Sequence, residues 1–369
     1  MTCEPLTYRV AFASLKGMTR SLAEEILSRT HSEQAFFEAS SSRLGAILGY
    51  KSKIFEDSYK TAALEKARRE MDFITAHNIK ALYFRDDSYP VRLADCEDAP
   101  LMLFTTGECD LNRKHIIGIV GTRHATPYGI SFTERLVENL AATLEEPPVI
   151  VSGLAFGIDI AAHNAALAQG LPTVAVLAHG LNTIYPAQHR QTAAAIARSN
   201  GMLATEYTSS DAVHKVNFIA RNRIVAGLCD ALIVSESAEK GGALITARLA
   251  GEYGRDVFAL PGRTSDRYSA GCNRLIADNT AALITGADDL IKAMRWKRKP
   301  QTDTQPSLFA ELNDEEQCVV DYLTEKGEAQ IGQISIALNM NTGKLLALLI
   351  DMEFKGLVLA FPGAKYRLA

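Results

Sequence analysis

The chain has 369 residues, of which 47% are hydrophobic and 22% charged, and its formal net charge is −4. This composition excludes an intrinsically disordered chain and a fibrous repeat, and the length predicts two or three domains. No apolar run reaches the roughly 18–20 residues that span a bilayer, and no signal segment opens the chain, so we expect a cytoplasmic protein without membrane contact. The six cysteines never stand as CxxC, which argues against a disulfide framework and a structural zinc site.

The charge is distributed unevenly along the chain. Residues 1–85 and 292–312 each carry a net charge of +3, whereas residues 86–291 carry −7 and residues 313–369 carry −3. A segment that is acidic overall repels nucleic acid at long range. An anion-binding site in the middle of the chain is therefore expected to be a local pocket.

Residues 1–79 are predicted to form an N-terminal helical domain, because β-branched residues are few and apolar residues recur at helical spacing. The periodic stretches lie at residues 6–15, 22–27, 35–37 and 55–74. A glycine turn separates the first two helices, and Thr19 or Ser21 is a candidate N-cap for the second. The pair is faintly similar to the SAM-like and helix-hairpin-helix modules that contact DNA backbones, but a helical packing module is the favoured interpretation.

Residues 80–294 alternate short apolar runs with segments of helix length. The apolar runs predict nine strands, at residues 81–84, 101–105, 116–120, 149–151, 173–177, 202–204, 231–234, 257–260 and 282–284. Helices are expected between them, at residues 128–144, 157–168, 191–199, 222–228 and 244–253. Because the runs are apolar along their whole length, they predict an α/β domain with a doubly wound parallel sheet covered on both faces. The site of such a fold lies at the C-terminal ends of its strands.

Residues 295–312 have the composition of a linker, with a basic cluster and two prolines. Residues 313–369 then predict three helices and a hairpin, an order typical of a winged helix. The helices are expected at residues 314–324, 331–338 and 342–355, with Asn341 before the third, and the hairpin strands at residues 357–361 and 365–368. In DNA-binding winged helices the third helix contacts DNA with polar side chains. Here it is rich in leucine, which favours a protein-interaction module.

The common nucleotide-binding and metal-binding motifs are absent from the sequence. No two glycines stand at positions i and i+2, which excludes GxGxxG, and neither GxxxxGK[ST] nor HExxH occurs. The eight histidines form no cluster with the spacing of metal ligands. The sequence therefore predicts neither a cofactor nor a metal.

Small and polar residues follow two of the predicted strands. Gly121, Thr122 and Arg123 end one strand with backbone amides and a guanidinium, which are groups that bind phosphate. Ser152 and Gly153 end the next strand in the same way. A purely structural role in the turn is the alternative in both loops. If the strands are parallel, the two loops meet at one edge of the sheet.

A basic segment inside the acidic domain is the strongest local signal. No Asp or Glu occurs between residues 211 and 230. The candidate binding residues of this segment are Lys215, Asn217, Phe218, Arg221 and Asn222. Cations suit the phosphates of a single strand, and an aromatic ring stacks on its bases at about 1–3 kcal/mol per base. The residues leave open whether Phe218 stacks on a base or packs in a core beneath solvated charges.

In order and spacing, these motifs resemble those of the DNA-processing protein A family (DprA, also called Smf) over about residues 80–290. The matching residues are Tyr89-Pro90, Pro100-Leu101, Gly121-Thr122-Arg123, Tyr128-Gly129, Ser152 to Asp159 with Ala162-His163, Gly180, Tyr185-Pro186, Glu206, Phe218 to Asn222 with Arg223-Ile224, Leu244-Ile245-Thr246-Ala247, Pro261-Gly262 and Gly271-Cys272-Asn273. The chain departs from the family pattern at Gly242, at His189 and at Ala204-Thr205, where serine, asparagine and serine are usual.

The resemblance implies an extended Rossmann-like domain that binds single-stranded DNA and forms a homodimer. It implies a recombination mediator that protects incoming DNA and loads the recombinase RecA onto it during natural transformation. By this resemblance Arg123, Lys215, Phe218, Arg221 and Asn222 line the strand-binding pocket. Ser152 and Gly153 are then expected at its floor.

We expect no enzyme activity, although a nucleotide-processing enzyme is the alternative. The related phosphoribohydrolases carry a Pro-Gly-Gly-x-Gly-Thr loop and a catalytic glutamate. The nearest counterpart here, Pro261-Gly262-Arg263-Thr264, lacks the second glycine and carries a bulky cation. No nucleophile–base pair stands at a recognisable spacing. A regulator built around the winged helix is a third interpretation, which the acidity of that domain weakens.

Overall fold

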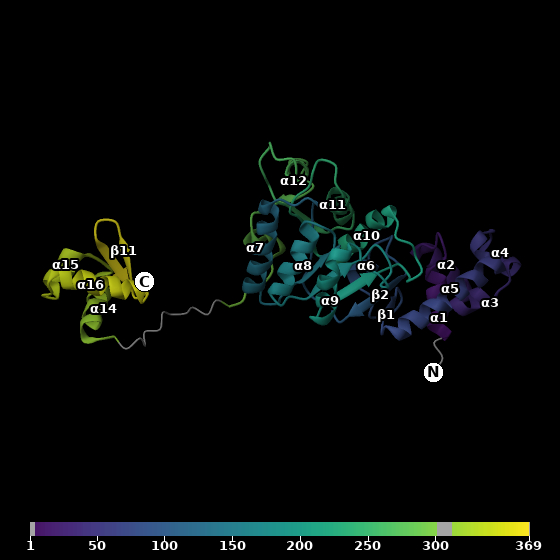
Figure 1. The fold of residues 1–369 in the computed structure, drawn as a ribbon, viewed down its shortest axis with the longest axis horizontal. Coiled ribbons are helices and arrows are strands. Elements are labelled where there is room, and N and C mark those ends of the chain that lie inside the picture. The colour runs from purple at the N-terminus through teal and green to yellow at the C-terminus, as the bar shows by residue number, and fades with distance from the viewer. Residues whose placement is uncertain (1–3, 301–311, 369) are drawn as a thin grey trace. The chain divides into compact units, whose positions relative to one another are not determined.

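The computed structural model describes residues 4–300 and 312–368 (Figure 1). By their internal contacts the residues divide into two compact units, Met1–Lys299 and Pro300–Ala369. The N-terminal helices and the α/β part therefore belong to the same unit. Their limits as separate domains stay a prediction.

The first unit begins with helices, as the sequence predicts. They are α1 (Glu4–Ala13), α2 (Arg20–Thr30), α3 (Glu33–Glu38), α4 (Ser41–Leu48), the 3-10 turn η1 (Lys53–Phe55) and α5 (Asp57–Ala76). Thr19 is the N-cap of α2, because its hydroxyl accepts a hydrogen bond from the Leu22 N–H at 3.2 Å. Phe36 packs edge to face against both Phe12 and Phe55 between the helices.

Nine strands form one sheet in the order β1-β2-β6-β5-β4-β3-β7-β8-β9. The strands are β1 (Lys80–Tyr83), β2 (Met102–Gly107), β3 (Ile116–Val120), β4 (Val149–Ser152), β5 (Thr173–Val176), β6 (Met202–Thr205), β7 (Ala231–Val234), β8 (Asp256–Ala259) and β9 (Ala282–Leu283). The nine predicted strands are confirmed. Ile117 and Ile119 pack on one face of the sheet and Ile116 and Val120 on the other, so both faces are buried.

One edge of the sheet differs from the parallel arrangement that the sequence predicts. Strands β3 to β9 pair in parallel, but β2 pairs antiparallel with both β1 and β6. The segment between β1 and β2 holds only the one-turn helix α6 (Val91–Ala94). Residues 84–101 are long enough for a parallel crossover but contain no long helix to make one, and the connection reverses the direction of the chain.

The helices of the α/β part lie close to their predicted positions, with one exception. They are α7 (Pro127–Thr143), α8 (Ile158–Ala168), the 3-10 turn η2 (Ala187–His189), α9 (Arg190–Arg198), α10 (Lys215–Leu228), α11 (Gly242–Glu252), α12 (Ala270–Ala277) and α13 (Ala287–Met294). Helix α10 begins at Lys215, whereas the sequence predicts a start at residue 222. No side chain caps this start, so the sequence carries no local signal for it. The basic segment is therefore helical.

The residues after α13 pack on the first unit. The Trp296 ring lies 4.3 Å from the His115 ring, and the Lys299 N–H donates to the Thr143 carbonyl at 2.8 Å. Residues 295–299 of the expected linker are thus held against α7. The part of that linker at residues 301–311 lies outside the described residues.

The second unit contains three helices and a three-stranded antiparallel sheet. Its elements are α14 (Asp314–Lys326), β10 (Glu328–Gln330), α15 (Ile331–Ala337), α16 (Thr342–Phe354), β11 (Val358–Phe361) and β12 (Lys365–Leu368), with sheet order β10-β12-β11. Asn341 caps α16 as the sequence predicts, since its side chain accepts from the Gly343 N–H at 2.9 Å. Strand β10 is an addition to the predicted hairpin.

A helix that spans a membrane must be both long and apolar. Among the residues that the structure describes, no single helix meets both requirements. Helices α15 and α16 meet them only as a pair, across a break that bends them by 113°.

Buried polar contacts join the N-terminal helices to the α/β part. Glu70 of α5 is only 3% exposed, and its carboxylate accepts from the Ser209 N–H at 2.9 Å and from the Ser209 hydroxyl. Lys66, one turn earlier, pairs with Asp211 at 2.6 Å. A single hydrophobic core also runs from α1 and α5 to the sheet. These contacts make the helices an integral part of the first unit.

Glu70→Ala is expected to lower the free energy of unfolding by about 1.5–3 kcal/mol, because it leaves the Ser209 donors without their charged acceptor. Urea unfolding followed by circular dichroism measures this change. Asp72→Ala is the matched control on the same helix, where the side chain is exposed, and should change stability by less than about 0.5 kcal/mol. Equal effects of the two substitutions would contradict the structural role of Glu70.

Candidate nucleic-acid interface

A cavity of about 350 Å³ lies where β3, β4 and β7 end, between the first turns of α10 and α11. This is the sheet edge at which the sequence predicts a site. Six of the ten candidate residues line the cavity, namely Gly121, Thr122, Arg123, Phe218, Arg221 and Asn222. The other four, Ser152, Gly153, Lys215 and Asn217, lie nearby without lining it.

A buried carboxylate holds the loop that carries Arg123. Glu236 follows β7, and its side chain accepts from the Thr126 N–H at 2.8 Å and from the Thr126 hydroxyl at 2.6 Å. Its backbone carbonyl accepts from the Thr122 N–H at 2.7 Å. Gly121 is required here because a Cβ atom would lie 2.4 Å from the Ile158 side chain. Glu236 is a positioning residue that the sequence motifs did not single out.

Phe218 lies at the rim of the cavity with a cation and a second ring. It is half-buried and belongs to no hydrophobic core cluster among the described residues. The Arg123 guanidinium carbon lies 5.6 Å from the centre of its ring, and the Tyr185 ring meets it edge to face at 5.5 Å. Tyr185 is 51% exposed. Phe218 therefore lies outside these core clusters, and stacking of its ring on a base stays a prediction.

Arg221 points into the protein, although it also lines the cavity. It is 3% exposed, its guanidinium donates to the Gly153 carbonyl at 2.7 Å and to the Val176 carbonyl, and burial lowers its pKa. Gly153 is required beneath it, because a Cβ atom there would lie 2.4 Å from the guanidinium. Arg221 therefore fixes α10 against the ends of β4 and β5.

Two further candidate residues are hydrogen-bonded within the protein. Ser152 is fully buried, and its hydroxyl donates to the Ile119 carbonyl at 2.6 Å. The Asn217 amide donates to the Ala212 carbonyl at 3.3 Å. Lys215, in contrast, is exposed at the start of α10. A direct role of these residues in binding stays a prediction, and the structure gives Ser152 and Asn217 a positioning role.

The cavity is also lined by groups that the sequence motifs did not reveal. Lys240 and Arg267 line it together with Tyr268 and His124. The Arg267 guanidinium lies 5.7 Å from the Tyr268 ring centre, and the Tyr268 and His124 rings stack at 6.3 Å. Only the glycines of these loops stood out in the sequence, because an isolated cation in a loop carries no pattern.

The cavity is locally positive inside an acidic part of the chain. Four cations line it, Arg123, Arg221, Lys240 and Arg267, against a single acid, Asp159. Asp159 is buried, which raises its pKa against the opposing effect of Arg221, and its carboxylate accepts from the Gly153 N–H at 3.2 Å. The cavity thus has the local positive charge that the predicted anion pocket needs, and anion binding itself stays a prediction. Among residues 4–300 and 312–368, no three His, Cys, Asp or Glu side chains are placed to bind a metal ion.

The chain is similar to known proteins over most of its length. The DNA processing protein DprA of Streptococcus pneumoniae is 41% identical over 206 residues, which cover 56% of this chain and 71% of that protein. Protein Smf of Escherichia coli is 32% identical over 284 residues, which cover 76% of this chain and 75% of that protein.

Two solved structures share the fold. The X-ray structure of DprA from Streptococcus pneumoniae has a TM-score of 0.64 and 31% identity, and the match covers 78% of this chain and 97% of that one. A structure of DNA processing protein A from Helicobacter pylori, which describes that protein's single-stranded DNA binding mode, has a TM-score of 0.52 and 30% identity, covering 59% and 95%. The α/β part therefore has the Rossmann-like fold of these proteins.

The model of one protein family, DNA recombination-mediator protein A, matches residues 80–295, which are more than half of the chain. The match begins at β1 and ends just after α13, so it includes every strand of the large sheet and the whole cavity. The chain belongs to the DNA recombination-mediator protein A family.

Proposed function

We propose that the cavity binds single-stranded DNA and that this chain acts through it as a recombination mediator. The observation that carries the proposal is the Arg123 guanidinium over the Phe218 ring, beside the exposed Tyr185 ring. Cations for phosphates and aromatic faces for bases are the two components of single-strand binding sites. The single-stranded DNA binding mode described for the Helicobacter pylori relative supports the proposal.

The geometry favours a single strand over a duplex. Phe218 is half-buried, so only an unstacked base reaches its ring, and the bases of a duplex are stacked on one another. The exposed cations come from three different loops that line the cavity, with Arg123 after β3, Lys240 after β7 and Arg267 after β8. A flexible backbone can follow cations that are spread over three loops.

The remaining functions of the family are part of the proposal. We propose that the protein protects incoming DNA and loads RecA onto it during natural transformation, in the cytoplasm and as a homodimer of its α/β part. The support is the family membership of residues 80–295.

The second unit is proposed to be a winged helix that binds a protein partner. Three helices and a small antiparallel sheet support the winged-helix assignment. Helix α16 carries Leu346, Ile350 and Phe354 at intervals of four residues, and all three are exposed, Phe354 by 89%. An apolar stripe of this kind suits a protein surface better than DNA.

The proposed function involves no catalysis. Asp159 is the only acid among the described residues that line the cavity, and two backbone N–H groups hold its carboxylate. A hydrolase on nucleotides needs a carboxylate or nucleophile that is free to meet its substrate. A nucleotide-hydrolysis assay run beside the binding measurements tests this part, and turnover would contradict it.

Arg123→Ala is expected to weaken single-strand binding and to lower the slope of log K against log salt by about 0.7, since one phosphate contact is lost. Fluorescence anisotropy with labelled single-stranded and blunt duplex oligonucleotides over a salt series measures both quantities. Lys215→Ala should lower the slope by a similar amount. Arg135→Ala, on the exposed side of α7, is the control and should leave the slope unchanged. Equal affinity for the duplex would refute the single-strand site.

Phe218→Ala is expected to weaken single-strand binding by roughly 1–3 kcal/mol, because the ring no longer stacks on a base. Its cost in unfolding free energy should stay well below the roughly 3–5 kcal/mol of a buried phenylalanine. Thermal melts and binding isotherms on the same variant measure the two effects. Phe354→Ala, an exposed ring in the second unit, serves as the control. A large loss of stability with unchanged affinity per folded molecule would rule out stacking.

Removal of residues 300–369 is expected to leave a homodimer, because the proposed dimer interface lies in the α/β part. The deletion takes away the whole second unit and nothing of the first. Multi-angle light scattering on the shortened and full-length chains gives the masses. A monomer after the deletion would place the interface in the second unit.

A further inference from the structure

A second pair of aromatic rings lies in the single-strand cavity, besides the Phe218 ring. Tyr268 and His124 line the cavity, and their rings stack with 6.3 Å between the centroids and 26° between the planes. His124 is exposed and Tyr268 is half-buried. Tyr268 belongs to no hydrophobic core cluster among the described residues, and its hydroxyl has no hydrogen-bond partner there. Packing within the protein therefore does not account for this pair of rings.

Two neighbouring residues after β7 hold the loops that carry these rings. The Ser237 N–H donates to the Tyr268 carbonyl at 2.7 Å. The Glu236 carbonyl accepts from the Thr122 N–H at 2.7 Å, two residues before His124. Backbone hydrogen bonds of this kind fix both loops without a ligand, so that binding does not have to order them. Because His124 is exposed, a flat group can reach the stack.

The cations beside these rings have no acidic partner. The Arg267 guanidinium carbon lies 5.7 Å from the Tyr268 ring centre, and Lys240 lines the cavity as well. Arg123, Lys240 and Arg267 take part in none of the ion pairs formed by the described residues. A guanidinium without a carboxylate partner is free to bind phosphate. The ring pair therefore has beside it the two kinds of group that a nucleotide needs, a flat face and a cation.

The two aromatic positions of the cavity are linked through consecutive residues. Arg123 lies over the Phe218 ring, with its guanidinium carbon 5.6 Å from the ring centre, and His124 stacks on Tyr268. The Cα atoms of consecutive residues are only about 3.8 Å apart. In single-strand sites, successive bases stack on aromatic side chains while cations follow the backbone. With one aromatic position and one cation for each, the arrangement matches two neighbouring nucleotides.

We propose that the His124–Tyr268 pair is a second base-stacking position, so that the cavity holds two neighbouring nucleotides of one strand. One base stacks on Phe218, and its phosphate meets Arg123. The next base stacks on the His124–Tyr268 pair, and its phosphate meets Arg267. The inference rests on the proposed function of the same cavity and adds to it the residues that set how many nucleotides are held.

Tyr268→Leu keeps an apolar side chain but removes the aromatic face, and it should raise the Kd for single-stranded DNA about five- to hundredfold. Fluorescence anisotropy with a fluorescein-labelled oligothymidylate and the full-length protein measures this value. Tyr268→Phe keeps the ring and should retain most of the affinity. Tyr50→Leu changes a tyrosine of the N-terminal helical part that does not line the cavity, and as the matched control it should leave the Kd unchanged.

Two further variants test the position through exposed residues, whose replacement is not expected to impair folding. His124→Ala should raise the Kd about fivefold, at the lower end of the range for one stacked base. Arg267→Ala should lower the slope of log K against log salt by about 0.7, since one phosphate contact is lost. Arg263→Ala, in the same loop but outside the cavity, should leave the slope unchanged. Thermal melts show that each variant is folded.

A double variant distinguishes two stacking positions from one. If separate bases stack at Phe218 and at Tyr268, the fold-changes of Phe218→Ala and Tyr268→Leu should multiply when the two are combined. A double variant that binds no more weakly than Phe218→Ala would place both rings on one base and overturn the proposal. Unchanged binding in folded Tyr268→Leu and His124→Ala, with binding still weakened in Phe218→Ala, would also overturn it and leave the proposed function standing. Absence of single-strand binding by the unaltered protein would overturn both.

Discussion

The hydrogen bonds of the buried Arg221 guanidinium are the interaction on which the rest of the α/β part depends. A buried cation is costly unless carbonyl or carboxylate groups accept its hydrogen bonds, and burial lowers the pKa of Arg221. Here the Gly153 and Val176 carbonyls accept its hydrogen bonds at the ends of two parallel strands. Because α10 is fixed at this point, Phe218 one turn earlier lies at the cavity rim.

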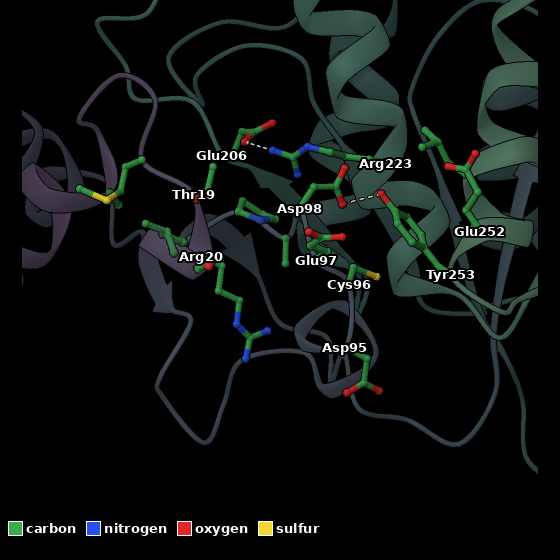
Figure 2. Close-up of a pocket in the computed structure, with 17 residues that line it drawn as sticks. Thr19, Arg20, Asp95, Cys96, Glu97, Asp98, Glu206, Arg223, Glu252 and Tyr253 are labelled. Atoms are coloured by element: carbon green, nitrogen blue, oxygen red, sulfur yellow. Dashed lines mark hydrogen bonds and ion pairs between the residues drawn. The ribbon is translucent and has the colours of Figure 1, made fainter. Parts of the chain in front are cut away.

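Helix α10 contributes residues to two cavities. Its residues 218, 221 and 222 line the basic cavity, and Arg223 lines a second cavity of about 910 Å³ together with the carboxylates of Asp95, Glu97, Asp98, Glu206 and Glu252 (Figure 2). Arg221 and Arg223 stand two positions apart and therefore point to different sides of the helix. Helix α10 thus places one arginine at a basic cavity and another at an acidic one. Because the two arginines are close together in the chain, the sequence alone shows only a single basic segment.

The fold was more predictable from the sequence than the site. Nine strands were recognisable because a strand buried on both faces is apolar throughout, and helix α10 was placed late because nothing caps its start. The direction of β2, the second strand from one edge, was misjudged because direction depends on how a connection folds back. Arg123 and Phe218 were found from local composition. The burial of Arg221, the ring of Tyr185 and the carboxylate of Glu236 depend on contacts between distant segments, which one sequence does not contain.

The acidic surroundings of the basic cavity separate the speed of binding from its strength. The whole chain carries a net charge of −4, so under the proposed function a DNA strand that approaches from a distance is weakly repelled before it reaches the four cations. Salt screens this long-range repulsion over the Debye length of roughly 8–10 Å and so favours encounter. The same salt weakens the phosphate contacts that hold the bound strand. Under the proposed function, association and dissociation are therefore both expected to become faster as ionic strength rises, so that strands exchange more rapidly at the salt concentrations that bind them less tightly.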